Sequence, residues 1–389
     1  MVRVSSLFQA DWLFERAAAI AGSDDFGEPY FRDALEVLLR SWDEEAALHP
    51  ARAWRTCGAV VDLLATRARL TARWKAQPEL ANRQVAAPIF IVGLPRTGTT
   101  LLHNLLASLP GCRAFRLWEL RAPVAPQGAG AEWAEQQIAQ TAEDLRGLYA
   151  RVPGFDRIHL MEAEAPDECS WLFRHTFTTL VFAFMSRVPS YARWMVERAP
   201  RAAYADYRRQ LQILGERAGN ARLVMKDPCH LWHLEVVLET FPDAVVVQAH
   251  RDLAEVVPSF ASLCHALHTM DSGHSDPVAT GAYCVELADR GLAAMMDVRD
   301  RAPHARFVDV RYQDLVADPL GILERIGGAI GRPLDEQGAL SAAAWLASHP
   351  GRGRHLYQPE DFGLEAGALR ARHAAYARRF DLAEPPVRA

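Results

Sequence analysis

The stretch PIFIVGLPRTGTTLL, residues 88–102, decides the fold of this chain. Residues 88–92 form a short apolar run with β-branched side chains, which is typical of a buried strand. Residues 93–98 form a glycine-containing turn, and the apolar run after Thr99 predicts a helix that ends at Pro110. A strand, a turn and a helix in this order direct free backbone N–H groups and the positive end of the helix dipole toward one point. The stretch therefore predicts a site for an anion.

The turn has the spacing of the phosphate-binding loop G-x4-G-K-[ST], except that Thr99 stands where the lysine is expected. Ordinary nucleotide hydrolases use that lysine on the β- and γ-phosphates and the next hydroxyl on Mg²⁺. The missing lysine argues against hydrolysis of ATP or GTP, and Arg96 supplies a cation within the loop instead. The alternative interpretation is a tight strand–helix turn with incidental threonines.

The chain has 389 residues, of which 50% are hydrophobic and 23% charged, so it can bury one large core or two modest ones. A net charge of −5 argues against nucleic acid as a partner, although a local basic pocket is compatible with it. Six scattered cysteines without C-x-x-C spacing favour reduced thiols over disulfides or zinc. Residues 1–22 lack the apolar segment of a signal peptide, and no apolar run approaches the ~18 residues of a membrane span. We therefore expect a cytoplasmic protein with no stable membrane insertion.

The pattern along the chain predicts an α/β fold, a P-loop-like parallel sheet flanked by helices. Residues 1–85 show helical spacing and form a predicted N-terminal extension, followed by an α/β domain at 86–389 with a helical insertion at 127–220. Further strands are expected at 222–226, 244–250 and 306–312, with helices near 230–240, 253–268 and 319–331. Ligands of such sheets bind at the carboxyl ends of the strands.

Basic residues follow two of these strands. Lys226 in LVMKDPCHLWHL ends a predicted strand and points toward the ligand crevice, unless it is a surface lysine. Arg251 in HRDLAEVVPSF follows another strand, and Ser259 lies eight residues later, about two helical turns. An arginine fork and a hydroxyl can hold a second phosphate, although an Asp–Arg surface pair is the alternative. Arg354 in GRGRHLY either closes over a phosphate or belongs to a solvated basic loop. A ligand with two separate phosphates would fit these groups.

These residues resemble the sulfotransferase superfamily, which transfers a sulfuryl group from 3′-phosphoadenosine 5′-phosphosulfate (PAPS). PRTGTT is similar to the family's 5′-phosphosulfate loop, and HRDLAEVVPSF is similar to its 3′-phosphate motif. KDPCHLWHLEVVLETFPDAVVVQAHRD resembles the protein-tyrosine sulfotransferases. RLWELRAPVAP, EAEAPDECSWLF and GRGRHLYQPEDFGL resemble a bacterial branch with a helical N-terminal extension. The resemblance covers roughly residues 20–380.

The resemblance implies PAPS as the donor, 3′,5′-adenosine bisphosphate as the product, and no metal. It implies that Arg96 and Lys226 stabilise charge on the oxygen between phosphate and sulfate. It implies a 5′-phosphate site made by the loop residues Gly93, Arg96, Thr97, Gly98, Thr99 and Thr100. It also implies that Arg251 and Ser259, closed by Arg354, hold the 3′-phosphate.

The acceptor hydroxyl needs a general base, for which the sequence offers two candidates. Glu119 lies about where related protein-tyrosine enzymes carry a glutamate, but its spacing differs by about two residues, and it can instead pair with a neighbouring arginine. His230 is the rival, because a neutral imidazole is a natural base. It can instead be a helix-start residue that contacts Asp227.

The predicted insertion either lines an acceptor site with aromatic side chains or buries them in a core. These side chains are Trp171, Phe173, Phe177, Phe182, Phe184, Tyr191 and Trp194. A site made by them would suit a small apolar or phenolic acceptor better than a highly charged sugar. The helical extension is compatible with a homodimer.

Two other functions compete with sulfuryl transfer. A P-loop kinase for a small molecule is disfavoured by the missing lysine, and only Asp227 is a candidate ligand for Mg²⁺ at a strand end. A non-catalytic nucleotide sensor is disfavoured because Arg96, Lys226, Arg251 and Ser259 occur together.

Overall fold

The computed structural model describes residues 8–350 and 357–382 and divides into two compact units. Unit 1 contains the described residues of segments 1–85, 115–219 and 266–275. Unit 2 contains those of segments 86–114, 220–265 and 276–389. The predicted assignment of residues to domains stays a prediction.

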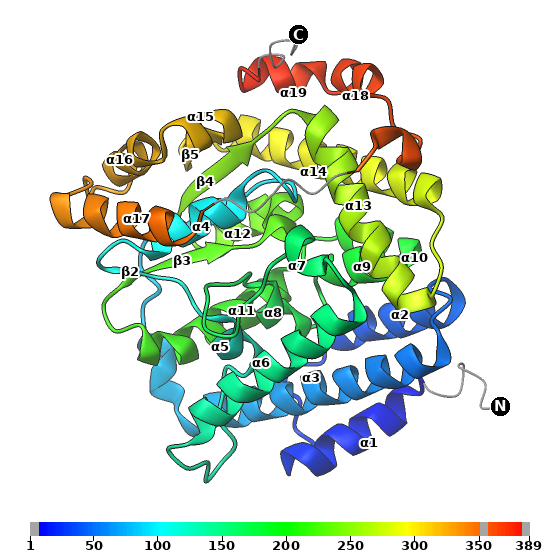
Figure 1. The fold of residues 1–389 in the computed structure, drawn as a ribbon. Helices are drawn as coiled ribbons and strands as arrows, with labels where there is room; N and C mark the ends of the chain where they lie inside the picture. The colour runs from blue at the N-terminus through cyan, green and yellow to red at the C-terminus, as the bar shows by residue number, and fades with distance from the viewer. Residues whose placement is uncertain (1–7, 351–356, 383–389) are drawn as a thin grey trace. The chain divides into compact units, whose positions relative to one another are not determined.

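Unit 2 is built on a five-stranded sheet in which every pairing is parallel (Figure 1). The strand order is β2-β3-β1-β4-β5. The strands are β1 (Ile89–Val92), β2 (Cys112–Arg113), β3 (Arg222–Lys226), β4 (Val245–His250) and β5 (Arg306–Arg311). Four of them lie at the predicted positions, so the predicted α/β fold is confirmed. The sequence analysis missed β2, because two residues are too short for a visible alternation pattern.

The central strand β1 is buried along its whole length, which matches its unbroken apolar sequence. Its side chains alternate between the two faces of the sheet. Ile89 and Ile91 pack with Leu102, Leu105 and other apolar residues on one face. Phe90 points to the other face, where its ring contacts that of Phe241 at 5.0 Å.

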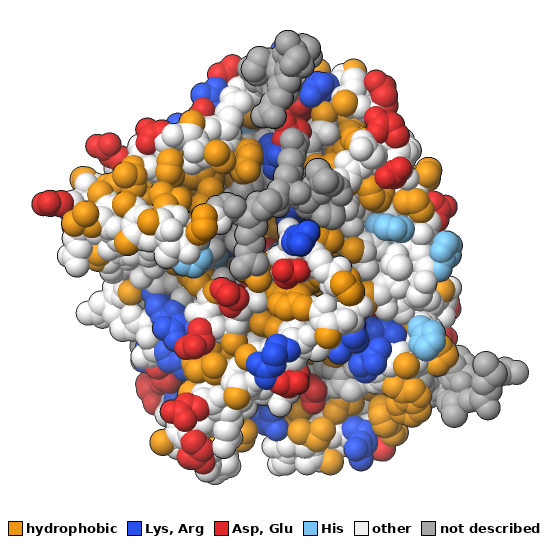
Figure 2. Space-filling view, in the orientation of Figure 1, with side chains coloured by type: hydrophobic (Ala, Val, Ile, Leu, Met, Phe, Trp, Pro, Cys, Tyr) orange, Lys and Arg blue, Asp and Glu red, His pale blue; other side chains and the backbone are white. Residues whose placement is uncertain are grey.

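Helices surround the sheet of unit 2. They are α4 (Thr99–Ala107), η4 (Pro228–His233), α12 (Leu234–Thr240), α13 (Leu253–Ser272, which continues into unit 1), α14 (Pro277–Arg301), α15 (Tyr312–Ala317), α16 (Pro319–Ala329), α17 (Glu336–Ser348), η5 (Pro359–Phe362), α18 (Ala366–Arg372) and α19 (Ala374–Arg379). Figure 2 shows hydrophobic side chains gathered over α16 and α17, where Leu340 is 64% exposed.

The regular secondary structure in the described residues of unit 1 consists of helices joined by loops. It contains α1 (Ala10–Ala21), α2 (Phe31–Glu44), α3 (Pro50–Ala76), η2 (Pro78–Asn82), α5 (Leu117–Arg121), α6 (Trp133–Arg151), α7 (Phe155–Ile158), α8 (Ser170–Arg174), α9 (Val181–Met185), α10 (Pro189–Val196), α11 (Arg201–Leu214) and η3 (Gly215–Arg217). No helix in the described part of the chain is long and apolar enough to cross a membrane.

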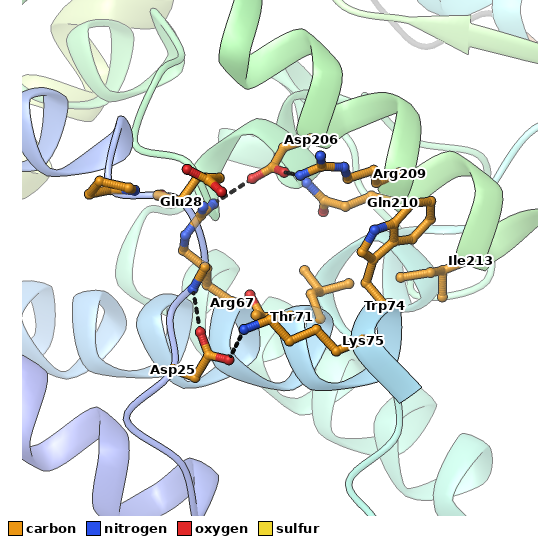
Figure 3. Close-up of a pocket in the computed structure, with 13 residues that line it drawn as sticks. Asp25, Glu28, Arg67, Thr71, Trp74, Lys75, Asp206, Arg209, Gln210 and Ile213 are labelled. Carbon is orange, nitrogen blue, oxygen red and sulfur yellow. Dashed lines mark hydrogen bonds and ion pairs between the residues drawn. The ribbon is translucent and has the colours of Figure 1, made fainter. Parts of the chain in front are cut away.

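The buried side chain of Arg67 connects two helices of unit 1 beside a cavity of about 400 Å³ (Figure 3). Arg67 of α3 forms an ion pair with Asp206 of α11 at 2.8 Å. Its Nε–H donates to the Phe26 carbonyl at 2.8 Å, and its guanidinium also donates to the carbonyls of Glu28 and His175. These contacts connect α3 to α11 and to two loops, so Arg67 contributes to the packing of unit 1.

We expect Arg67→Ala to lower the free energy of unfolding by about 3–5 kcal/mol, because it leaves Asp206 and several buried carbonyls without their donor. Arg73→Ala is the matched control on the same helix. Its ion pair with Glu216 is about one-third exposed on both sides, so its loss should cost less than about 1 kcal/mol. Urea unfolding of both variants measures the difference, and equal losses would contradict the structural role of Arg67.

Two buried histidines make the stability depend on pH. Burial lowers the pKa of His175 in unit 1 and of His233 in unit 2 to about 4, from a usual value of 6.5. The unfolded chain therefore binds protons between pH 6.5 and 4 that the folded chain does not bind. The stabilisation is complete above pH 6.5 and is lost as the pH falls toward 4.

On acidification from pH 7.5 to 5.0, each histidine should reduce the free energy of unfolding by about 2 kcal/mol. His175→Asn keeps an N–H donor for Gln210, whose Oε1 lies 3.0 Å from His175 Nδ1. The variants His175→Asn and His233→Asn should each lose less stability than the wild type over this range. Urea unfolding at both pH values is the test, and identical pH dependence in wild type and variants would contradict it.

Candidate active site

The loop after β1 has a backbone that few residues tolerate. Gly93 and Gly98 have φ angles of +152° and +92°, and Arg96 between them has a φ of +75°. A side chain on Gly93 would lie 2.8 Å from the Ala249 carbonyl, so glycine is required there. The left-handed conformation of Arg96 costs about 1–2 kcal/mol, and such strain gathers at functional sites.

The threonines of the loop fall into different environments. The Thr97 hydroxyl donates to the Leu94 carbonyl at 2.8 Å, so it closes the loop upon itself. Thr99 is buried at the first position of α4, whereas Thr100 is exposed. The free N–H groups at the start of α4 therefore remain the main donors that the loop offers to an anion.

The structure joins the two anion sites that the sequence suggested as separate. Arg96 Nε donates to Ser259 Oγ of α13 at 3.1 Å, and Arg251 donates to the Arg96 carbonyl at 3.1 Å. Burial lowers the pKa of Arg96, and the positive charge of Arg251 acts in the same direction. Arginine stays charged near neutral pH, so two partly desolvated cations are held close together. Such a pair favours a bound anion.

Three groups around Arg251 were missed by the sequence analysis. The guanidinium forms an ion pair with Glu255 one helical turn later, with Nε 3.0 Å from the carboxylate. It also lies 4.1 Å from the ring centre of Tyr312, which packs against Gly98. Tyr357 donates to the Glu255 carbonyl at 3.1 Å. The i,i+4 spacing and the strand-end position were signals for Glu255 and Tyr312, but Tyr357 is brought here by the tertiary structure.

Lys226 is the last residue of β3 and is only 2% exposed, so the alternative of a surface lysine is wrong. Its register places it opposite Ile91 of β1. Lys226 Nζ lies 3.4 Å from Thr100 Oγ1, which brings the ammonium to the start of α4. The adjacent Asp227 accepts from the Cys229 N–H at 2.8 Å and so caps η4.

The two candidate bases are both buried. Glu119, in unit 1, accepts a hydrogen bond from the Arg116 N–H at 2.8 Å and forms the capping box of α5. This contact is to a backbone N–H, and the arginine ion pair considered from the sequence stays an alternative. His230, in unit 2, has its ring edge-on to that of Phe90 with centroids 5.1 Å apart, and its backbone N–H donates to the Asp227 carbonyl. Arg354 lies outside the described residues.

The aromatic residues of the predicted insertion belong mainly to a core. Five of them are buried: Phe173, Phe177, Phe182, Phe184 and Tyr191. Trp171 and Phe182 also line a cavity of about 220 Å³ in unit 1, together with Trp42, Arg52, Arg55, Arg121 and Arg174. The guanidinium of Arg174 stacks 3.7 Å from the Trp171 ring. Asp62 and Asp271 also line this cavity, so it combines apolar side chains with charges of both signs.

Comparison with known proteins identifies similar proteins that are sulfotransferases. A crystal structure of a sulfotransferase from Mycobacterium tuberculosis H37Rv is 31% identical, covers 94% of this chain and 98% of its own, and superposes with a TM-score of 0.83. A sulfotransferase from Mycobacterium avium, at 24% identity, shares the fold with a TM-score of 0.86 over 96% of this chain and 97% of its own. The omega-hydroxy-beta-dihydromenaquinone-9 sulfotransferase of Mycobacterium bovis is 29% identical over 283 residues, which are 70% of this chain and 69% of that protein.

The model of the sulfotransferase family matches residues 88–336, from the strand before the loop to the start of α17. This range holds the loop, Lys226, Arg251 and Ser259, on which the resemblance rested. A family of enzymes that transfer a sulfuryl group accounts for both the loop without its lysine and the second group of cations. The chain belongs to the sulfotransferase family and is a transferase of the EC 2.8.2 type.

Proposed function

We propose that the enzyme transfers a sulfuryl group from PAPS to a hydroxyl of a small apolar or phenolic acceptor. PAPS as the donor is supported mainly by the continuous cluster that Arg96 of the loop forms with Ser259 and Arg251. The loop N–H groups would hold the 5′-phosphosulfate, and Arg251 with Ser259 would hold the 3′-phosphate. The glycine at position 93 supports this fit indirectly, because a side chain there would meet Thr97 and Ala249 and so distort the loop.

In the proposed reaction the acceptor oxygen attacks sulfur in line with the bond to the bridging oxygen. The new S–O bond forms as the old one breaks, and the bridging oxygen leaves with the bisphosphate. Negative charge then grows on that oxygen, where Lys226 and Arg96 would stabilise it. The acceptor proton passes to Glu119 or His230. No triphosphate takes part, which agrees with a loop that lacks lysine.

The two candidate bases call for paired isosteric variants, Glu119→Gln and His230→Asn. Loss of the base should lower kcat by about 10²–10⁴-fold with little change in donor binding. The other variant should retain most of its activity. Retention of full activity in both would exclude both residues as the base.

An apolar acceptor is supported by the Mycobacterium bovis relative, which is named for a menaquinone derivative. A cytoplasmic location, a homodimer and closure by Arg354 stay predictions.

The experiment that tests the proposal is a thermal-shift titration with 3′,5′-adenosine bisphosphate, compared with ATP plus Mg²⁺. A ligand that binds the folded state raises the unfolding midpoint by mass action. We expect a rise with the bisphosphate and a smaller one, or none, with ATP plus Mg²⁺. A rise with ATP plus Mg²⁺ alone would overturn the proposal and favour a kinase.

A further inference from the structure

The C-terminal segment of unit 2 contacts the residues on both sides of Arg251. Tyr376 lies in α19 and Arg370 in α18, more than one hundred residues after Arg251 in the chain. Tyr376 meets His250, which precedes Arg251, and Arg370 meets Asp252, which follows it. The arginine is therefore flanked by two contacts from one distant segment.

The first contact is a buried chain of hydrogen bonds. His250 is fully buried, with its Nδ1 2.9 Å from the Tyr376 hydroxyl and its Nε2 2.9 Å from Asp309 Oδ1. Although burial favours the protonated acid, hydrogen bonds from His250 and Arg299 lower the pKa of Asp309 to about 2. A charged Asp309 accepts from Nε2–H, so Nδ1 is left to accept from the tyrosine. Burial raises the pKa of Tyr376, and the backbone of Arg251 beside the hydroxyl acts in the opposite direction.

Ring packing also stabilises this chain of hydrogen bonds. The Phe380 ring stacks on His250 with centroids 3.9 Å apart and planes 21° apart. Phe380 also contacts Tyr376 at 5.1 Å. The hydroxyl of Tyr376 is thus fixed against the end of β4 by packing as well as by hydrogen bonds.

The second contact fixes the start of α13. Arg370 Nε lies 2.9 Å from Asp252 Oδ2, and the other carboxylate oxygen of Asp252 accepts from the Ala254 N–H at 3.0 Å. Asp252 therefore joins the first turn of α13 to α18. Because Arg251 lies between two anchored neighbours, its backbone has little freedom to move.

We propose that Tyr376 and Arg370 are positioning residues that hold Arg251 for the 3′-phosphate and so set the preference for a 3′-phosphorylated donor. The inference rests on the proposed function, because it assigns Arg251 to the 3′-phosphate. Arg251 reaches the loop through its hydrogen bond to the Arg96 carbonyl, so a 5′-phosphate bound at the loop should depend on it much less than the 3′-phosphate does. The two residues should therefore affect one phosphate and not the other.

The test compares 3′,5′-adenosine bisphosphate with adenosine 5′-monophosphate by calorimetric titration of Tyr376→Phe and Arg370→Ala. We expect each variant to weaken bisphosphate binding by about three- to tenfold, as expected for an unsatisfied buried group or a lost charged hydrogen bond. Binding of the monophosphate should change by less than about twofold, because no lost contact concerns the loop. Arg370→Lys, which keeps a cation near Asp252, should restore part of the preference.

Arg372→Ala is the matched control. Arg372 lies on the same helix α18 but pairs with Asp289, so the preference for the bisphosphate should stay at the wild-type value. Equal weakening of both ligands, or no weakening, in Tyr376→Phe and Arg370→Ala would overturn the inference and leave a purely structural role. A wild-type enzyme without any preference for the bisphosphate would overturn the proposed function itself, and the inference with it.

Discussion

Replacing Lys226 with alanine is expected to lower kcat by about 10²–10³-fold, while the dissociation constant for 3′,5′-adenosine bisphosphate changes by less than about threefold. Lys226 ends β3 in a buried position, with its ammonium 3.4 Å from Thr100 Oγ1. In the proposed role, this cation would act on charge that develops only in the transition state. Its loss therefore slows the chemical step more than it weakens the binding of the product nucleotide.

Single-turnover kinetics and calorimetry of Lys226→Ala measure the two quantities separately. The chain has only two lysines among its 43 basic residues, so Lys75→Ala is the natural control. Lys75 is exposed and pairs with Asp25 in unit 1, and its removal should leave kcat unchanged. A Lys226→Ala variant that keeps wild-type kcat would contradict the catalytic role proposed for this residue.

Replacing Arg251 with alanine is expected to weaken binding of the bisphosphate by about 30- to 150-fold, because charge-assisted hydrogen bonds to a phosphate contribute about 2–3 kcal/mol. Binding of adenosine 5′-monophosphate should change much less. The hydrogen bond from Arg251 to the Arg96 carbonyl will also be lost, so a small effect on the loop is expected. Calorimetric titration of both nucleotides measures the ratio of the two affinities, which tests the role proposed for Arg251.

Glu255→Gln is the matched variant with the opposite expected sign. In the structure Glu255 holds the Arg251 guanidinium, and its negative charge opposes a phosphate at the same place. Removal of that charge should leave bisphosphate affinity unchanged or raise it by a few-fold. A loss of affinity in Glu255→Gln as large as that in Arg251→Ala would show that Glu255 orients Arg251 for the phosphate. It would contradict the expectation that Glu255 competes with the phosphate for Arg251.

The main strands were predictable because their sequence signal is local. Residues 88–92 and 244–250 are largely apolar, 222–226 has an apolar centre, and 306–312 mixes polar and apolar side chains. The structure places strands within each of these segments. The loop and Lys226 were predicted as site residues in the same way, because ligands of a parallel sheet bind at the strand ends. The five buried aromatic residues of the predicted insertion were ambiguous, since core and pocket residues share one composition.

The sequence by itself determined the nature of the site: a glycine loop without lysine, a cation at the end of β3 and an arginine after β4. These features depend on short spacings between residues, which can be recognised in the sequence alone. Only the tertiary structure decided how the cations are held. Arg96 meets Ser259 across 163 positions of the chain, and Tyr376 meets His250 across 126. Contacts over such separations leave no periodicity in the sequence, because they arise from the packing of whole elements against the sheet.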